Sequence, residues 1–480
     1  MLPTITIDIG TTSIKLCAFD AESAAVASAR VATPTIRDDG GEIYDVDALH
    51  AAIRAFIGDV DARTRSSIDR VAVTGVGESG ALVRPDITLA SPLILWHDQR
   101  GLPHLVDLDE RARSRIYEVT GLPVSGNYGL SKVAWALAQA GSPKDVLWLN
   151  VAEYIAATMT GRRWAEPTLA SRTMALDLVD RVWSSEASSL VGVDVGVFPP
   201  LRPAGEGVPI SPGFAQQVGL RSDVQVHVAG HDHMVGGVGS GLKRGELLNS
   251  TGTTEGLLLL QAAPSLDTRA ERAKLANGLA CTGEDFTLFA SIPTGGSAFA
   301  TLQHLTGVDA TDLVGRIDAV HHRYVAGGLD PRRAPLVLPR FRGAPPPTKD
   351  HSARGIVAGI RADTTLDELV FGCFLGMVRQ FGDVLHLFGA TPSRIKVIGP
   401  ASSNSLWQQL KSDYLGVPLT ASREPEVVSL GAQALASGEP RRWDAVNPLD
   451  IETSPERHAL LREWSEDSEA QWAHLKGFPS

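Results

Sequence analysis

The apolar residues near the start of the chain alternate with polar ones. Isoleucines occupy every second position from Ile5 to Ile9, and a second apolar segment, residues 13–20, follows the turn Gly10-Thr11-Thr12. Alternation with a period of two is typical of strands with one buried face. The pattern therefore predicts two strands joined by a tight turn, and residues 24–33 are a candidate third strand.

The spacing then changes to that of an amphipathic helix. From Asp45 to Ile57, apolar residues recur every three or four positions, which predicts a helix with one buried face. The apolar segment 70–77 predicts a buried strand that ends in a glycine-rich loop carrying Glu78. Three strands, a helix and a strand in this order indicate an α/β fold with a mixed sheet and helices on its faces.

The second half of the chain repeats the opening pattern. Residues 247–260 again read as a strand, a Gly-Thr-Thr turn (Gly252, Thr253 and Thr254) and a strand. The repeat predicts two related domains, each of which offers a phosphate-binding loop to a shared cleft. We place the boundary near residues 239–243, which gives domains 1–242 and 243–480.

Apolar periodicity also predicts helices elsewhere, and a strand over 395–398. The predicted helices cover residues 132–140, 152–159, 366–388, 404–415 and 426–436. Residues 101–203 are expected to be an insertion that widens the first domain. The tail after Glu439 has mixed charge and predicts no function.

Composition narrows the class of protein. With 480 residues, 43% hydrophobic and 21% charged, the chain has the make-up of a globular protein of two or three domains. A net charge of −11 argues against nucleic-acid or anionic-membrane partners. The three cysteines are too few for a disulfide framework, and neither a signal peptide nor a membrane-spanning run is recognisable. We expect a cytoplasmic location.

The glycine-rich stretch 229–255 carries an isolated carboxylate, Asp232, directly after an apolar strand. A carboxylate at a strand end that faces a turn rich in N–H and hydroxyl groups can take a proton from a nucleophile attacking phosphorus. The alternative is that the stretch forms two connector loops. A third interpretation is a metal-dependent hydrolase site, because His231 and His233 flank Asp232, although no third His or Cys follows at ligand spacing.

Asp8 precedes the first turn, and Lys15 lies on the strand that returns from it. An acidic residue inside an apolar strand is costly without a purpose. Asp8 is therefore a candidate to hold Mg²⁺ through water, and Lys15 to balance phosphate charge. The structural alternative is a β-hairpin with a solvated Asp and Lys.

Three further segments carry candidate binding groups. Residues 95–100, Leu-Trp-His-Asp-Gln-Arg, combine an aromatic ring with polar groups that suit a polyhydroxylated ligand, or form a polar loop with a partly buried Trp. Residues 293–297 open a helix whose free N–H groups either bind an anion or serve only as its N-cap. Residues 398–404 link a strand to a helix, where a nucleotide base or ribose can lie, unless this is an ordinary connecting loop.

Taken together, these segments resemble the FGGY carbohydrate kinases, the family of glycerol kinase, xylulokinase and gluconokinase. The matching blocks are IDIGTTSIK (7–15), AGHDHMVGG with NSTGTTE (229–237 and 249–255), and VIGPASSNSLWQQLKSDYLGVPL through LGAQALA (397–436). LWHDQR (95–100) is similar to the family's Trp-x-Asp-x-Arg substrate segment, and residues 338–355 to its mid-domain loop. The resemblance implies a two-domain actin/hexokinase-like ATPase fold, with a ribonuclease-H-like core in each domain and a cleft between them.

The resemblance also implies an activity: an ATP- and Mg²⁺-dependent kinase that phosphorylates a terminal hydroxyl of a small sugar, sugar acid or polyol. Asp232 is then the general base, and closure of the domains excludes water. The implied metal residues are Asp8, through water, and Asp232. The implied substrate-binding residues are Glu78, Trp96, Asp98, Arg100 and Asp232. The implied ATP-binding residues are Gly10, Thr11, Thr12, Lys15, Gly252, Thr253, Thr254, Gly295, Gly296, Gly399 and Asn404.

Two departures from the family pattern matter. The chain has Gly399-Pro400-Ala401 where the family usually has consecutive glycines, and proline lacks an N–H and fixes φ, so altered nucleotide binding is expected. The loop 77–80 lacks the Gln-Met-His-Gly pattern of xylulokinases, which argues against D-xylulose. A non-catalytic, sugar-binding regulator on the same fold is the alternative from another class. A homodimer is the candidate assembly.

Overall fold

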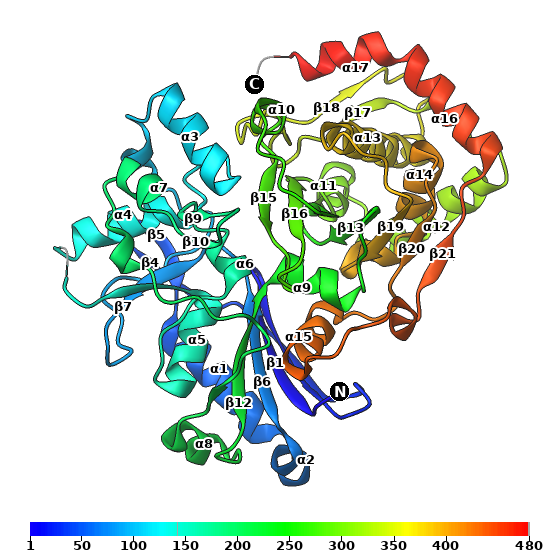
Figure 1. The fold of residues 1–480 in the computed structure, drawn as a ribbon. Helices are drawn as coiled ribbons and strands as arrows, with labels where there is room; N and C mark the ends of the chain where they lie inside the picture. Colours follow the sequence, from blue (N-terminus) through cyan, green and yellow to red (C-terminus); the bar gives the residue numbers. More distant parts are fainter. Residues whose placement is uncertain (142, 479–480) are drawn as a thin grey trace.

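The computed structural model, which describes residues 1–141 and 143–478, has two lobes, each built on a large mixed sheet (Figure 1). The first sheet has the strand order β11-β12-β6-β1-β2-β3, and the second has the order β15-β16-β14-β13-β19-β20-β21. The strands of the first sheet come from residues 4–231, and those of the second from residues 246–451. The boundary predicted at residues 242/243 therefore falls between the two sheets.

The first sheet has the predicted order of elements. Its strands are β1 (Thr4–Ile9), β2 (Ser13–Phe19), β3 (Ala25–Ala32), β6 (Arg70–Gly75), β11 (Val208–Pro209) and β12 (Gln225–His231). β1, β2 and β3 are antiparallel neighbours, whereas β6 runs parallel to both β1 and β12. The predicted helix is α1 (Val46–Asp59), and a hairpin of β4 (Thr35–Asp38) and β5 (Gly41–Tyr44) precedes it.

The second sheet repeats this topology. Its strands are β13 (Glu246–Thr251), β14 (Glu255–Gln261), β15 (Ala276–Leu279), β16 (Phe286–Ile292), β19 (Arg394–Ile398), β20 (Leu419–Ala421) and β21 (Leu449–Ile451). The run β12-β6-β1-β2-β3 and the run β20-β19-β13-β14-β16 have the same order and the same directions. Each Gly-Thr-Thr turn joins the first two strands of its sheet, so the predicted duplication is present in the architecture.

Helices cover these sheets and build the periphery of each lobe. The first lobe has α2 (Ala62–Ser67), α3 (Glu110–Thr120), α4 (Gly129–Gln139), α5 (Val151–Thr160), α6 (Pro167–Ala170), α7 (Ser185–Leu190) and α8 (Pro212–Val218). The second has α10 (Thr268–Arg272), α11 (Ser297–Thr306), α12 (Ala310–Val325), α13 (Leu366–Leu387), α14 (Ser405–Leu415), α16 (Pro455–Asp467) and α17 (Glu469–Lys476). Small hairpins pair β7 (Gly80–Val83) with β8 (Leu147–Asn150), β9 (Leu176–Asp177) with β10 (Val182–Trp183), and β17 (Leu336–Leu338) with β18 (Ile356–Ala358). Short 3₁₀ turns are η1 (Leu102–Leu105), η2 (Val195–Val197), η3 (Pro331–Arg333), η4 (Pro400–Ser403) and η5 (Trp443–Val446).

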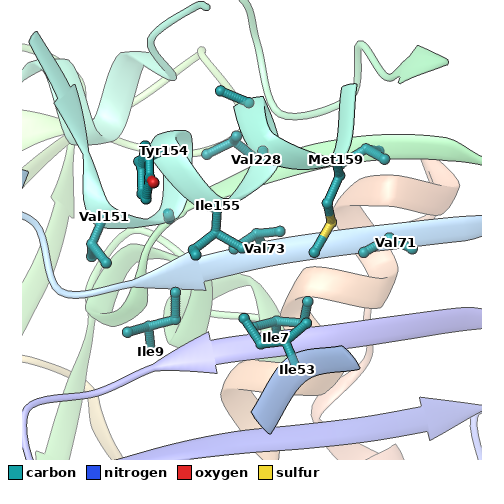
Figure 2. Packing of buried hydrophobic residues seen from close by; sticks show 14 of the residues in the cluster. Ile7, Ile9, Ile53, Val71, Val73, Val151, Tyr154, Ile155, Met159 and Val228 are labelled. Carbon is teal, nitrogen blue, oxygen red and sulfur yellow. The ribbon is translucent and has the colours of Figure 1, made fainter. Parts of the chain in front are cut away.

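The core of the first lobe surrounds β1, the strand that carries Asp8. Ile7 and Ile9, on either side of it in β1, are fully buried. Figure 2 shows Ile155 and Met159 of α5 packed over the β6 residues of the same cluster. Each buried side chain of this size contributes about 1.5–3 kcal/mol of hydrophobic stabilisation, which offsets the cost of one carboxylate in the strand.

The glycine-rich stretch after β12 is a helix, α9 (Asp232–Gly239), so the interpretation as a connector loop was wrong for this part. α9 packs directly against α15 (Val427–Ser437), which also packs on β1 and β6 of the first sheet. A Cβ atom at Gly239 would collide with the Val427 carbonyl, and one at Gly431 with the Val235 carbonyl. Glycine at these two positions therefore allows α9 and α15, the two helices that join the lobes, to pack closely.

The tail belongs to the second lobe. Arg379 of α13 is 1% exposed, and its guanidinium lies 4.8 Å from the ring of Trp472 and 5.3 Å from that of Trp464. It donates hydrogen bonds to Ser468 and Glu469 at the junction of α16 and α17. Among the described residues, no helix is long and apolar enough to span a membrane.

Candidate active site

The first turn places Asp8 beside Lys15. The two residues are opposite each other in the β1–β2 register, and Lys15 Nζ donates to Asp8 Oδ2 at 3.1 Å. Asp8 is 3% exposed, and its Oδ1 has no hydrogen-bond partner in the part of the chain that the structure describes. The negative charge of Asp8 raises the pKa of Lys15. The predicted hairpin is therefore present, but Asp8 is buried rather than solvated, and one of its oxygens has no hydrogen-bond partner among the described residues.

Asp232 is the first residue of α9, where its side chain is 23% exposed. Its Oδ1 accepts a hydrogen bond of 2.7 Å from the His233 N–H. Burial, followed by the negative charges of Asp8 and Glu78, raises the pKa of Asp232 to about 8. The fold thus brings three carboxylates that are far apart in sequence into electrostatic contact, and gives one of them a high proton affinity.

The two histidines beside Asp232 make polar contacts within the site, and His231 Nε2 lies 3.6 Å from Asp232 Oδ1. His231 Nδ1 lies 2.9 Å from the Met234 sulfur, and His233 Nδ1 lies 3.0 Å from the Ser250 hydroxyl. Burial and the nearby Arg172 charge lower the pKa of both, that of His233 to about 4. Within the described residues, no group of three or more His, Cys, Asp or Glu side chains is placed to hold a metal ion. The hydrolase interpretation therefore lacks a ligand set.

The second turn, Gly252 to Thr254, is held by the start of α11. The N–H groups of Gly295 and Gly296 donate to the carbonyls of Thr253 and Gly252 at 3.1 and 2.8 Å. A Cβ atom at Gly295 would lie 2.6 Å from the Thr254 carbonyl carbon, which explains the need for glycine there. Of the two interpretations of residues 293–297, an anion site or only a helix start, the first is not available to these two N–H groups, because they donate to the turn, whose Thr253 is exposed.

A cavity of about 450 Å³ lies beside Gly399, lined by loops of the second lobe and by Arg30 of β3 in the first. Its lining includes Arg30, Gly399, Pro400, Ser402, Ser422 and Arg423. Gly399 has φ +98°, and a Cβ atom there would lie 2.5 Å from the Thr251 carbonyl oxygen. Asn404, by contrast, accepts a hydrogen bond of 3.0 Å from the Trp407 N–H and caps α14. The loop 399–403 thus forms one wall of the cavity, and Asn404 anchors its end.

The side chains of residues 95–100 contact two different parts of the first lobe. Trp96 Nε1 donates to the Thr11 hydroxyl at 2.9 Å, at the first turn. Arg100 is nearly buried, and its guanidinium hydrogen-bonds Asp98 and Asp38 at 2.9–3.0 Å while stacking on Trp135 at 4.7 Å. Asp98 and Arg100 therefore hold the β4–β5 hairpin through Asp38, a residue that the sequence did not single out.

Glu78 is paired with Arg172, a residue that the sequence did not single out. Arg172 Nε and Nη2 donate to Glu78 Oε1 at 2.9 and 2.8 Å, and both side chains are buried. Lys132, also buried, donates to the carbonyls of Gly126 and Asn127, and burial lowers its pKa to about 7. Arg172 and Lys132 are charged residues within apolar segments, and the same pattern in the sequence identified Asp8.

Two family models match the chain in sequence. The N-terminal domain of the FGGY family of carbohydrate kinases matches residues 4–239, and its C-terminal domain matches residues 247–438. The chain belongs to the FGGY family of carbohydrate kinases. The predictions of the family and of the two-domain actin/hexokinase-like fold are thereby confirmed.

Individual relatives are distant but span nearly the whole chain. A glycerol kinase of Aquifex aeolicus is 25% identical over 96% of this chain and 95% of its own. A xylulose kinase of Bacillus subtilis is 23% identical over 90% of this chain and 87% of its own. The solved structure of a xylulose kinase from Lactobacillus acidophilus superposes with a TM-score of 0.86, at 20% identity, and covers 100% of both chains. That of a gluconate kinase from the same organism superposes with a TM-score of 0.86, at 21% identity, and covers 99% of both chains. These superpositions establish the fold.

Family membership fixes the reaction class. The protein is a phosphotransferase with an alcohol group as acceptor and ATP as co-substrate. The prediction of an enzyme is confirmed, which removes the support for a non-catalytic regulator.

Proposed function

We propose that this FGGY-family kinase transfers the γ-phosphoryl group of ATP to a terminal hydroxyl of a small sugar, sugar acid or polyol, with Asp232 as the general base. The observation that carries the proposal is the position of Asp232. It lies at the end of β12, within electrostatic reach of the Asp8–Lys15 pair, and its pKa is raised to about 8. A base must have a high proton affinity to accept a hydroxyl proton.

The proposed transfer has one acid–base step. The acceptor hydroxyl gives its proton to Asp232 while its oxygen forms a bond to the γ-phosphorus. The bond between that phosphorus and the β–γ bridging oxygen breaks, and ADP leaves. Lys15 lowers the pKa of Asp232, and we expect additional cations of the bound nucleotide complex to act in the same direction. The base is then deprotonated when the complex is assembled.

The residues present fit a magnesium ion. Mg²⁺ prefers oxygen ligands and usually keeps several waters, and Asp8 offers a buried Oδ1 without another partner among the described residues. Asp8 is therefore the proposed residue that holds the ion through water, with Asp232 as a second carboxylate nearby. When bound, Mg²⁺ would neutralise charge on the phosphates.

We assign the nucleotide to the two turns and the cavity beside Gly399. Gly10, Thr11, Thr12 and Lys15 on the first lobe and Gly252, Thr253 and Thr254 on the second are the proposed phosphate residues. The adenosine is assigned to the cavity of about 450 Å³ beside Gly399. Gly295 and Gly296 act through the turn they hold, and Asn404 through the loop it anchors.

Glu78 and Trp96 are the proposed residues that touch the acceptor. Glu78 is within electrostatic reach of Asp232, and Trp96 lies at the phosphate turn through Thr11. Asp98 and Arg100 shape the wall behind them.

The test is ADP release from Mg·ATP across a panel of ketoses, polyols and sugar acids. We expect at least one acceptor to release ADP in the wild-type protein, and Asp232→Asn to lower kcat by about 10²–10⁴-fold while acceptor affinity is retained. Asp444→Asn is the matched control, because this carboxylate is 78% exposed on the surface. Turnover retained in Asp232→Asn would remove Asp232 from the role of base.

A further inference from the structure

The peptide group that links Gly230 to His231, directly before Asp232, is held from both sides by side-chain hydroxyls. Thr74 of β6 donates to the Gly230 carbonyl at 2.7 Å. On the other side, the Thr168 hydroxyl of α6 accepts a hydrogen bond of 2.8 Å from the His231 N–H. Both threonines are fully buried. Two elements that are far apart in sequence thus fix both polar groups of one peptide, immediately before the proposed base.

β12 departs from a regular strand at this point. Its parallel register with β6 shifts between Val228 and Gly230, and Gly230 has φ +123°. A Cβ atom on Gly230 would lie 2.5 Å from the Thr168 hydroxyl and 3.1 Å from Glu166 Oε2. Glycine therefore lets the end of the strand approach Thr168. An irregularity of this kind changes the direction in which the following side chains point.

The Thr168 hydroxyl is itself fixed in one orientation. It donates to Glu166 Oε2 at 2.5 Å, and the same oxygen accepts the N–H groups of Thr168 and Leu169 at 2.8 and 3.1 Å. Because the hydroxyl proton is given to Glu166, the hydroxyl oxygen is left to accept the His231 N–H. The Glu166 N–H in turn donates to Glu153 Oε1 at 2.9 Å. These bonds anchor α6 to α5 inside the core.

The hydrogen bonds continue to the loop that carries Glu78. Glu153 Oε2 accepts the Asn150 N–H at 2.7 Å. The side-chain amide of Asn150 faces the carbonyls of Gly77 and Ser79 at 2.7 and 3.2 Å, and donates to both when its nitrogen points toward them. The loop with the proposed acceptor contact and the strand end with the proposed base are therefore fixed to one buried network.

The two carboxyl groups in this network are costly to bury. Glu153 and Glu166 are each 1% exposed. Burial raises the pKa of Glu153 to about 7 and that of Glu166 to about 8, because the interior disfavours their charged forms. Such groups are tolerated where their hydrogen bonds are made, and a buried network of this kind fixes one arrangement of the segments that it joins.

We propose that Thr74 and Thr168 are positioning residues for phosphoryl transfer, and that their hydroxyls aim the Asp232 carboxylate at the acceptor hydroxyl. This inference rests on the proposed function, in which Asp232 is the base. Neither threonine touches a substrate in this role, because each acts on the base through the peptide before it. A displacement of about 1 Å in an active site can cost about 10²-fold in rate. Loss of either hydroxyl should therefore lower kcat and leave nucleotide binding intact.

The experiment replaces each hydroxyl with a methyl group and measures ADP release with the fastest acceptor of the panel. Thr168→Val and Thr74→Val keep the shape of the side chain, and we expect each to lower kcat by about 10- to 100-fold. KM for ATP should change by less than about threefold, because the lost interaction is not one with the nucleotide. Thr168→Ser and Thr74→Ser retain the hydrogen bond and should keep kcat within about threefold of the wild type.

Thr160→Val is the matched control. The Thr160 hydroxyl is also buried, but it donates to the Ala156 carbonyl of its own helix, at the end of α5 away from Asn150. This variant should leave kcat unchanged. A thermal melt shows which variants are folded at the assay temperature. The two valine variants act on opposite sides of the same peptide, so either one tests the inference if the other does not fold.

Three results would overturn the inference. The first is a folded valine variant that keeps the wild-type kcat. The second is a KM for ATP that rises as much as kcat falls, which indicates general damage to the fold. The third is a serine variant that loses as much as the corresponding valine variant, which assigns the effect to packing and not to the hydroxyl.

A failure of the kinase proposal gives a different result, because no acceptor then releases ADP in the wild-type protein. Amide hydrogen exchange over residues 225–239 tests the hydrogen bonds without turnover. Thr168→Val should abolish the protection of the His231 N–H, because the acceptor of that N–H is removed, and Thr160→Val should not. Unchanged protection of this N–H in Thr168→Val would contradict the inference.

Discussion

The indole Nε1 of Trp96 donates a hydrogen bond of 2.9 Å to the hydroxyl of Thr11. The bond joins the segment that we assign to the acceptor with the turn that we assign to the phosphates. It gives the two substrates a direct route by which the placement of one affects the other.

The first prediction concerns this bond. Trp96→Phe keeps an aromatic ring but removes the N–H donor, and a typical net hydrogen bond of about 0.5–1.5 kcal/mol implies a kcat/KM lower by about 2- to 12-fold. Thr11→Val removes the partner. Because both variants break the same bond, we expect the double variant to lose less than the product of the single effects. Independent, multiplicative losses in steady-state kinetics would show that the bond does not couple the sites.

The raised pKa of Asp232 predicts that the stability of the protein depends on pH. Its pKa is about 8 in the folded protein and about 3.9 in an unfolded chain. The folded state thus binds more protons between these values, and the free energy of unfolding falls as pH rises, by up to about 1.4 kcal/mol per pH unit. Asp232→Asn removes the titrating group, so its free energy of unfolding should not fall with pH for this reason. Its Tm should exceed that of the wild type by more at pH 8.5 than at pH 5, measured without ligands.

The control for this prediction is Asp444→Asn, whose carboxylate is exposed. Its Tm difference from the wild type should not depend on pH in the same range. An equal offset for Asp232→Asn at both pH values would contradict the raised proton affinity.

Asp8 makes a prediction about magnesium. Asp8→Asn removes the charge that we assign to holding the ion, and it leaves the residue nearly the same size. We expect the Mg²⁺ concentration for half-maximal ADP release to rise by about 10-fold or more, as loss of a charged contact worth about 1.5–3 kcal/mol implies. An unchanged Mg²⁺ titration, with a melt that shows a folded protein, would place the ion elsewhere.

Local patterns were enough to predict most of the fold and part of the site. Asp8, Lys15 and both turns follow from residues close together in sequence, because the β-hairpin that holds each turn is itself local. Arg172 was missed because it meets Glu78 only in the folded lobe, from a segment 94 residues away in sequence. The glycines of α9 were misinterpreted for a similar reason, since their function is contact with α15, about 200 residues away.

The last prediction concerns the wall of the nucleotide cavity. Gly399 has φ +98°, and a Cβ atom there would lie 2.5 Å from the Thr251 carbonyl oxygen, so Gly399→Ala must move the loop away from the phosphate turn. Gly438→Ala is the matched control, because Gly438 has φ +68° but open space around its Cβ position. Gly438→Ala carries a backbone cost of about 1–2 kcal/mol, and Gly399→Ala, at φ 98° and ψ 173°, carries about 1–3 kcal/mol. Only Gly399→Ala also displaces a wall of the cavity. We therefore expect Gly399→Ala alone to raise KM for ATP, by about 10-fold for a loss of ~1.4 kcal/mol, with KM for the acceptor little changed. If the two variants raised KM for ATP equally, strain and not the shape of the cavity would account for the effect, and the adenosine would have to bind elsewhere.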